Sequence, residues 1–143
     1  MRLGRRKRTI NRVLVVEDEP LVAFDTEYLL GDAGYSVVAT VDRVTDAVAV
    51  VGDGKDVDLV LVDVRLADGS GVEVARAAHG HGIAVLFVTG NCPSEGRSLA
   101  HGCLAKPYAA RDLLAAIDAL DQVRQGEQPR RLPNGLSLFA EMS

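Results

Sequence analysis

The sequence lacks most features of secreted and membrane proteins. It has only two cysteines, Cys92 and Cys103, and no C-x-x-C pair, so no disulfide framework is indicated and both thiols are expected to be reduced. No apolar run reaches the roughly 18 residues that span a bilayer. The basic N-terminus is not followed by the apolar core of a signal peptide. We therefore expect a cytoplasmic protein without a membrane partner.

Acidic residues are absent from the first 12 positions, which hold six basic residues. The rest of the chain has ten basic residues against 20 acidic ones, a balance that suits a bound cation. The basic segment has no interleaved aromatics and no amphipathic pattern, which favours a solvated, disordered tail over residues 1–10 rather than a nucleic-acid contact. No direct nucleic-acid binding is expected.

Short apolar runs alternate with segments of helical period along the chain, whose 143 residues suffice for one domain. The expected strands are 13–16, 35–39, 57–62, 83–88 and 103–105, and the expected helices are about 20–31, 42–51, 72–78, 93–100 and 110–123. Five alternating β-α units predict an α/β fold, a doubly wound five-stranded parallel sheet with helices on both faces.

The predicted domain spans residues 11–124, between two tails. Residues 125–143 contain glycine and proline with little periodicity, so they are expected to form a C-terminal tail. Leu136 and Phe139 could dock on the domain, but the sequence does not say where. About 20 residues after the last helix are too few for an output domain that binds DNA.

Polar side chains follow four of the predicted strands, at the sheet edge where ligands bind in doubly wound folds. Glu17 and Asp18 follow the first strand, Asp63 the third, Thr89 the fourth and Lys106 the fifth. Each has an ordinary structural alternative: an acid pair at a helix N-terminus, a capping Asp, a structural Thr and a solvated Lys. A single shared site explains the four positions better than four separate structural roles that happen to occur in this order.

Together these groups favour phosphoryl chemistry. Adjacent carboxylates repel unless a cation neutralises them, and hard oxygen ligands are those that Mg²⁺ prefers. A buried Asp63 can attack a phosphoryl group to form an acyl phosphate. The Thr89 hydroxyl can hydrogen-bond a phosphoryl oxygen, and the Lys106 ammonium can neutralise the charge that develops during transfer. The three histidines, His79, His81 and His101, form no ligand pattern.

Four segments resemble the receiver domain of two-component response regulators. They are Val-Val-Glu-Asp-Glu-Pro at 15–20, Leu-Val-Asp-Val-Arg-Leu at 61–66, Val-Thr-Gly at 88–90 and Lys-Pro-Tyr at 106–108. The resemblance covers about residues 11–124 and implies a flavodoxin-like (βα)5 fold. The Phe-Val-Thr-Gly run, which ends at Gly90, is similar to the Phe-Ala-Thr-Gly pattern of a subgroup of mostly single-domain receivers.

By this resemblance Asp63 is the phosphoacceptor. Glu17, Asp18 and Asp63 would hold Mg²⁺ with the backbone carbonyl of Arg65. Thr89 and Lys106 would contact the phosphoryl group. The donor would be a histidine kinase or a histidine phosphotransfer protein, and signalling would pass to a downstream protein. The chain itself would not be an enzyme beyond its own phosphorylation and slow dephosphorylation.

Other functions stay open. A receiver-like module that binds without phosphorylation and a phosphate sink or relay are both alternatives. A phosphohydrolase of the haloacid dehalogenase type would need a second aspartate, but Arg65 stands two residues after Asp63. The face made by the fourth helix, the fifth strand and the last helix is the expected partner surface and a candidate for homodimer contacts. Cys103 stands where many receivers have an aromatic switch residue, so we expect switching without such a ring, and little effect of Cys103→Ala.

Overall fold

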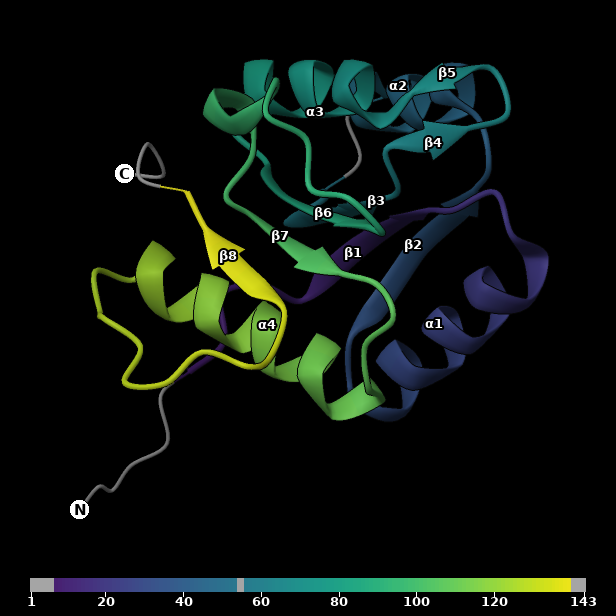
Figure 1. Ribbon diagram of the computed structural model, residues 1–143. Helices are drawn as coiled ribbons and strands as arrows, with labels where there is room; N and C mark the ends of the chain where they lie inside the picture. Colours follow the sequence, from purple (N-terminus) through teal and green to yellow (C-terminus); the bar gives the residue numbers. More distant parts are fainter. Residues whose placement is uncertain (1–6, 54–55, 140–143) are drawn as a thin grey trace.

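The computed structural model describes residues 7–53 and 56–139, and its centre is a six-stranded sheet in the order β2-β1-β3-β6-β7-β8 (Figure 1). The strands of this sheet are β1 (Arg12–Val16), β2 (Ser36–Val41), β3 (Leu59–Val62), β6 (Ala84–Thr89), β7 (Gly102–Ala105) and β8 (Leu136–Leu138). The helices are α1 (Pro20–Asp32), α2 (Val44–Gly52), α3 (Gly71–Gly80) and α4 (Ala110–Arg124), with a short 3₁₀ turn η1 (Arg97–Leu99). A small antiparallel hairpin of β4 (Arg65–Leu66) and β5 (Gly69–Ser70) follows β3.

The predicted doubly wound topology is confirmed. β1 lies between β2 and β3, and neighbouring strands from β2 to β7 are parallel. The chain moves to one side of β1 to form β2 and then crosses to the other side to form β3. The sheet edge beyond β1 and β3 is therefore the switch in strand order at which such folds bind ligands.

Helices cover both faces of the sheet, with α2 and α3 on one side and α1 and α4 on the other (Figure 1). The uninterrupted apolar run of β3 reflects this double cover. Val60 and Val62 pack in the core under α2 and α3, whereas Leu59 and Leu61 pack in the core under α1 and α4. All four side chains of β3 are buried, as expected for a central parallel strand.

The prediction of a helix at 93–100 is wrong. This segment contains only the single turn η1. Gly96, just before η1, has a φ of 83°, and a Cβ there would lie 3.2 Å from the side chain of Val72. A residue with a positive φ cannot belong to a right-handed helix, so Gly96, packed against α3, prevents a longer helix here.

The N-terminal tail predicted over residues 1–10 must be shortened. Residues 1–6 lie outside the described residues, but Thr9 and Ile10 are part of the folded body. Both backbone N–H groups donate to the carboxylate of Asp121 on α4, at 2.9 Å and 3.1 Å, and Ile10 is fully buried. The sequence prediction missed this because the anchoring carboxylate lies 111 residues away along the chain.

The C-terminal segment is also not a free tail, and the sheet is not purely five-stranded and parallel. Residues 136–138 form β8, which pairs antiparallel with β7, and Phe139 is buried beyond it. A Cβ at Gly102 would lie 2.8 Å from the carbonyl oxygen of Ser137, so the glycine permits the close approach of the two strands. β8 thus covers the β7 edge of the face predicted for partners.

The expectation of reduced thiols is wrong in this structure, since Cys92 and Cys103 form a disulfide. The fold brings their Cα atoms to 5.9 Å, a normal separation for a disulfide, although 11 residues separate them in sequence. In the described residues, no helix combines the length and apolarity that crossing a bilayer requires.

Candidate functional site

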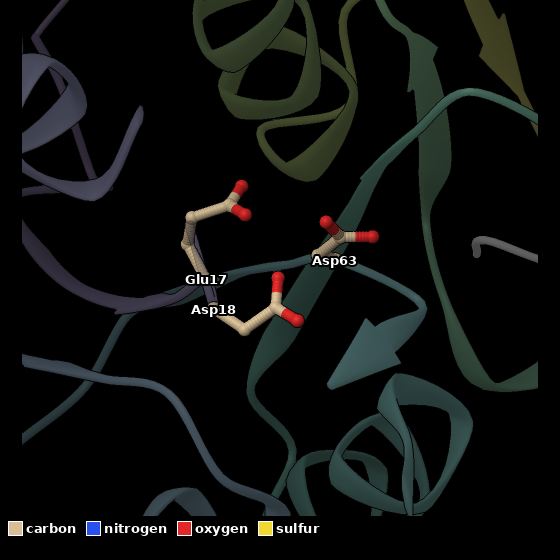
Figure 2. A group of neighbouring side chains, drawn as sticks. All are labelled: Glu17, Asp18 and Asp63. Atoms are coloured by element: carbon tan, nitrogen blue, oxygen red, sulfur yellow. The ribbon is translucent and has the colours of Figure 1, made fainter. Parts of the chain in front are cut away.

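The acidic residues of the site lie at the ends of two neighbouring strands. β1 and β3 pair in register up to Val16 and Val62, and the N–H of Asp63 donates to the carbonyl of Val16 at 3.0 Å. Glu17 and Asp63 are therefore side by side as the chain leaves the sheet. Figure 2 shows Glu17, Asp18 and Asp63 gathered around one space. The predicted convergence at this edge follows directly from the parallel pairing.

The three carboxylates are close enough to share one cation. Oxygen atoms from Glu17, Asp18 and Asp63 all lie within 4.8 Å of one another. Glu17 is buried, with 6% of its surface exposed, whereas Asp18 is open to solvent. The cluster therefore has a buried side fixed by the sheet and an open side from which an ion and its waters can enter.

Lys106 joins the carboxylates of Glu17, which is buried, and Asp63, which is mostly buried. Its Nζ donates to Oε1 of Glu17 at 2.9 Å and to Oδ2 of Asp63 at 3.1 Å. Its backbone N–H donates to the carbonyl of Thr89 at 2.8 Å, which fixes the end of β7 beside the end of β6. The Lys106–Pro107 peptide is cis. The structure thus places the predicted ammonium against the predicted phosphoacceptor.

The site has more negative than positive charge. Burial raises the pKa of Glu17, despite the opposing hydrogen bonds from Lys106 and from the N–H of Glu19. Burial alone would lower the pKa of Lys106, but its hydrogen bonds to Glu17 and Asp63 outweigh burial and raise that pKa. The Lys106 ammonium therefore stays charged between two acids, but its effect on the pKa of Glu17 is smaller than that of burial.

Asp63 is held from both of its oxygens. Oδ2 accepts from Lys106, and Oδ1 accepts from the backbone N–H of Arg65 at 3.2 Å. Only 12% of the Asp63 side chain is exposed. The backbone of Arg65 is thus fixed next to the Asp63 carboxylate, whereas the Arg65 side chain is exposed to solvent.

Gly71 packs against the backbone of Asp63, and the sequence analysis did not place it in the site. A Cβ at Gly71 would fall well inside contact distance of the Asp63 carbonyl oxygen and 2.9 Å from the side chain of Val62. The Gly71 N–H donates to the carbonyl of Val64 at 2.7 Å. The start of α3 therefore packs directly on the segment that contains Asp63 and Val64.

Thr89 ends β6 beside Ala105 of β7, and only 7% of its surface is exposed. In the described chain its hydroxyl makes no hydrogen bond with the acidic residues or with Lys106. The structure therefore brings Thr89 to the same sheet edge as the other predicted residues, with its hydroxyl not committed to any of them.

Tyr108 is a second residue that sequence reasoning left outside the site. It lines a small cavity of about 10 Å³ together with Glu17, Asp63 and Thr26. Burial raises the pKa of the Tyr108 hydroxyl, against the opposing effect of its hydrogen bond with Thr26. Its position directly after Pro107 was the available signal, but an aromatic there is equally compatible with simple packing on α4.

Curated relatives of the chain are regulators. The chain is 35% identical over 113 residues to the transcriptional regulatory protein DltR of Streptococcus agalactiae, covering 74% of this chain and 50% of DltR. It is 32% identical over 132 residues to the sensory transduction protein RegX3 of Mycobacterium tuberculosis, covering 87% and 56%. A shorter match, 41% identical over 58 residues, covers 41% of this chain and 22% of the phyllosphere-induced regulator PhyR of Methylorubrum extorquens. The chain spans about half the length of these relatives, or less.

Solved structures agree with this grouping. A CheY-like response regulator receiver domain protein from Methanospirillum hungatei superposes with a TM-score of 0.73 at 26% identity, covering 82% of this chain and 98% of that one. The chemotaxis protein CheY4 of Vibrio cholerae superposes with a TM-score of 0.69 at 25% identity, covering 77% and 98%. The response regulator receiver domain family matches residues 13–118, most of the chain, and the protein therefore belongs to this family.

Proposed function

We propose that Asp63 accepts a phosphoryl group from a phosphohistidine of a histidine kinase or a histidine phosphotransfer protein. The observation that carries this proposal is the placement of Asp63 beside Glu17 and Asp18 and in contact with the Lys106 ammonium, at the switch edge of the sheet. The family membership supports it, because receiver domains are the phosphorylated partners of two-component systems.

The roles of the residues follow from their positions. A carboxylate oxygen of Asp63 attacks the phosphorus atom, the P–N bond to the donor imidazole breaks, and an acyl phosphate forms on Asp63. Lys106, already 3.1 Å from Oδ2 of Asp63, stays close enough to neutralise charge on the transferred group. The uncommitted hydroxyl of Thr89 is available to hydrogen-bond a phosphoryl oxygen.

Mg²⁺ fits the donor set of the site. Carboxylate oxygens of Glu17, Asp18 and Asp63 within 4.8 Å of one another are hard ligands of the kind that Mg²⁺ binds, and the backbone carbonyl of Arg65 is proposed as a further ligand. Burial raises the pKa of Glu17, and a cation bound beside this carboxylate would favour its charged form. When bound, the ion would neutralise charge on the carboxylates and on the phosphoryl oxygens.

The donor protein is proposed to dock on α1. This helix presents three large apolar side chains to solvent near the site: Leu21, Phe24 and Tyr28 are 80%, 65% and 71% exposed. Their helical spacing places them on the outer face, while Ala23, Thr26 and Leu30 face the core. We define these three residues as the α1 stripe. A continuous exposed apolar stripe beside a reactive centre is a docking surface for a protein partner.

The downstream partner is proposed to be a protein, reached in the cytoplasm where receivers meet their kinases. The partner face predicted from the sequence lies over β7 and α4, and β8 covers the β7 edge in this structure. A homodimer through this face would therefore require β8 to move. Nucleic-acid binding by residues 11–124 is not part of the proposal.

Phosphorylation by a small donor tests the proposal directly. Incubation with acetyl phosphate and Mg²⁺ should add one phosphoryl group by intact mass, lost in Asp63→Asn and in the double variant Glu17→Gln, Asp18→Asn. Circular dichroism should show that both variants stay folded. Labelling of Ser70, Thr89 or a histidine in place of Asp63 would refute the assignment, and a wild type that never takes up phosphate would favour a module that binds without phosphorylation.

A further inference from the structure

The Cys92–Cys103 disulfide joins two segments that lead to the candidate site. Cys92 is exposed in the loop three residues after Thr89. Cys103 is fully buried in β7, three residues before Lys106. The cross-link therefore ties the loop that leaves Thr89 to the strand that ends at Lys106.

The first part of this loop has few other attachments. Residues 90–93 make no backbone–backbone hydrogen bond within the described chain. The far end is well anchored: the His101 N–H donates to the Val85 carbonyl at 2.8 Å, the Val85 N–H donates to His101 Nδ1 at 3.1 Å, and Ala100 is buried. The disulfide is thus the main restraint on the residues that directly follow Thr89.

Cys103, the buried cysteine of the disulfide, lies in β7 between β6 and β8. Cys103 pairs in register with Phe87 of β6 on one side and with Ser137 of β8 on the other. It also packs in one apolar cluster with Phe87 and Phe139. Cys103 is therefore connected both to the loop after Thr89 and to the packing of β8, which departs from the sequence-based expectation that Cys103→Ala has little effect.

The cytoplasmic location proposed above also favours exchange over a permanent bond. Disulfides in reducing cell compartments are usually transient or redox-sensing rather than structural. The exposed sulfur of Cys92 can be reached by small thiols, while the buried sulfur of Cys103 cannot. An exposed attacking position beside a buried resolving thiol is the arrangement found in reversible redox pairs.

We propose that Cys92 and Cys103 form a thiol–disulfide site that exchanges with the glutathione couple, and that its disulfide state restrains the loop after Thr89. In reduction, a glutathione thiolate attacks Sγ of Cys92, the protein S–S bond breaks, and Cys103 leaves as a thiolate that takes up a proton. A second glutathione thiolate then attacks the glutathione sulfur of the mixed disulfide, and Cys92 leaves as a thiolate that takes up a proton. Two glutathione molecules are oxidised to one glutathione disulfide as the protein gains two thiols, and oxidation is the reverse.

The consequence for signalling rests on the function proposed above. If Thr89 contacts the phosphoryl group on Asp63, the loop that follows Thr89 must adjust when that contact forms. The disulfide closes this loop between residues separated by 11 positions, which limits the adjustment. The reduced protein therefore transmits phosphorylation to the loop and to β8 more fully than the oxidised protein.

The experiment equilibrates the full chain in buffers of different ratios of glutathione to glutathione disulfide. Thiol alkylation and intact mass should show a reversible change between two free thiols and none. Hydrogen exchange of peptides covering 90–96 should be about tenfold faster in the reduced protein, because a cross-link that closes the loop is lost. Peptides from α2, far from the disulfide, provide the internal reference and should not change.

Two variants serve as controls. Cys92→Ser should show the fast exchange of the reduced protein in every buffer. Cys103→Ala leaves the exposed thiol alone and should bind one glutathione under oxidising conditions. The proposal is overturned if the disulfide never forms in glutathione disulfide, or if oxidised and reduced proteins exchange alike at 90–96. Acetyl phosphate labelling of the reduced protein tests Asp63 separately, so a failure of either proposal can be recognised on its own.

Discussion

Gly71 is the residue whose replacement should disturb Asp63, the proposed phosphoacceptor, most directly. A Cβ there would collide with the carbonyl of Asp63 and the side chain of Val62, and the Asp63 backbone cannot move aside as the end of a flexible side chain could. Gly71→Ala is expected to lower the free energy of unfolding by about 1–3 kcal/mol, as overpacking in a core does. It should also reduce labelling by acetyl phosphate, because Asp63 is displaced. Urea unfolding and intact mass measure the two effects.

Gly80 provides the matched control in the same helix. A Cβ at Gly80 has no atom within 4 Å, so Gly80→Ala adds a methyl group to open space. This variant should be neutral or more stable by up to about 1 kcal/mol, from the better helix propensity of alanine. Equal behaviour of the two variants would show that the close approach at Asp63 does not matter.

Asp121 should make the anchored N-terminal segment sensitive to acid. Burial alone would raise the pKa of this carboxyl, but hydrogen bonds from Thr9, Ile10 and Gln125 together outweigh burial and lower that pKa. A lowered carboxyl pKa contributes stability that is present above the unfolded-state value of about 3.9 and is lost as pH falls through the folded-state value. The contribution of Asp121 should therefore decrease as pH falls below about 4 and be lost once pH is below the folded-state pKa.

Asp121→Asn tests this expectation. The variant should lose about 1–3 kcal/mol at neutral pH, because an ionised acceptor of several hydrogen bonds becomes an amide. The difference from wild type should shrink as pH falls below about 4. Thermal unfolding across this range measures it, with Asp32→Asn on the exposed surface of α1 as the control. A difference that is constant with pH would contradict the role of the ionised carboxylate.

The residues of the site were predictable to different degrees. Glu17, Asp63, Thr89 and Lys106 each follow an apolar run, and parallel pairing brings strand ends together whatever the helices do. Gly71 was not predicted as part of the site, because a close approach between a helix start and a backbone carbonyl has no sequence signature. The geometry of Arg65 as a ligand stays a prediction.

At the scale of elements, truncation of Phe139 should release β8 as a unit while the rest of the sheet stays folded. Phe139 is 2% exposed, its N–H donates to the His101 carbonyl at 3.2 Å, and the guanidinium of Arg97 lies 4.4 Å from its ring centroid. Removing a buried Phe ring costs about 3–5 kcal/mol in a closed core. Phe139→Ala should cost less than this, because a short edge strand can leave while the strands from β2 to β7 stay paired.

Hydrogen exchange distinguishes local detachment from global loss. In Phe139→Ala, peptides covering 136–139 should lose protection while those of β3 and α3 keep it. Leu132→Ala, in the partly exposed segment that precedes β8, is the control and should leave protection unchanged. Faster exchange throughout the sheet would instead show that β8 is integral to the domain.

The helices and strands differ in how well the sequence predicts them. β1, β3 and β6 are continuous apolar runs covered on both faces, and their short length and β-branched residues identify them as strands. β8 has three residues and no neighbouring pattern, and its place depends on the free edge of β7 and on Gly102. The helix predicted at 93–100 was weak because it contains Gly96, and the structure has only a single 3₁₀ turn there.

At the scale of the whole molecule, the α1 stripe should separate protein donors from small donors. The stripe lies outside the acidic cluster, so it can affect docking without touching the chemistry at Asp63. Phe24→Ala combined with Leu21→Ser should reduce phosphotransfer from a histidine kinase that labels wild type by about tenfold or more, as expected when central apolar contacts of an interface are truncated. Labelling by acetyl phosphate should stay unchanged.

Val48 offers the matched control for this last prediction. It is a 38% exposed apolar residue on α2, a helix that covers the opposite face of the sheet, and Val48→Ala removes apolar surface there (Figure 1). Transfer rates for this variant should equal those of wild type with both donors. If the α1 variant loses acetyl phosphate labelling as well, the stripe supports the site itself rather than a partner. If it retains full transfer from the kinase, the donor docks on another face of the receiver.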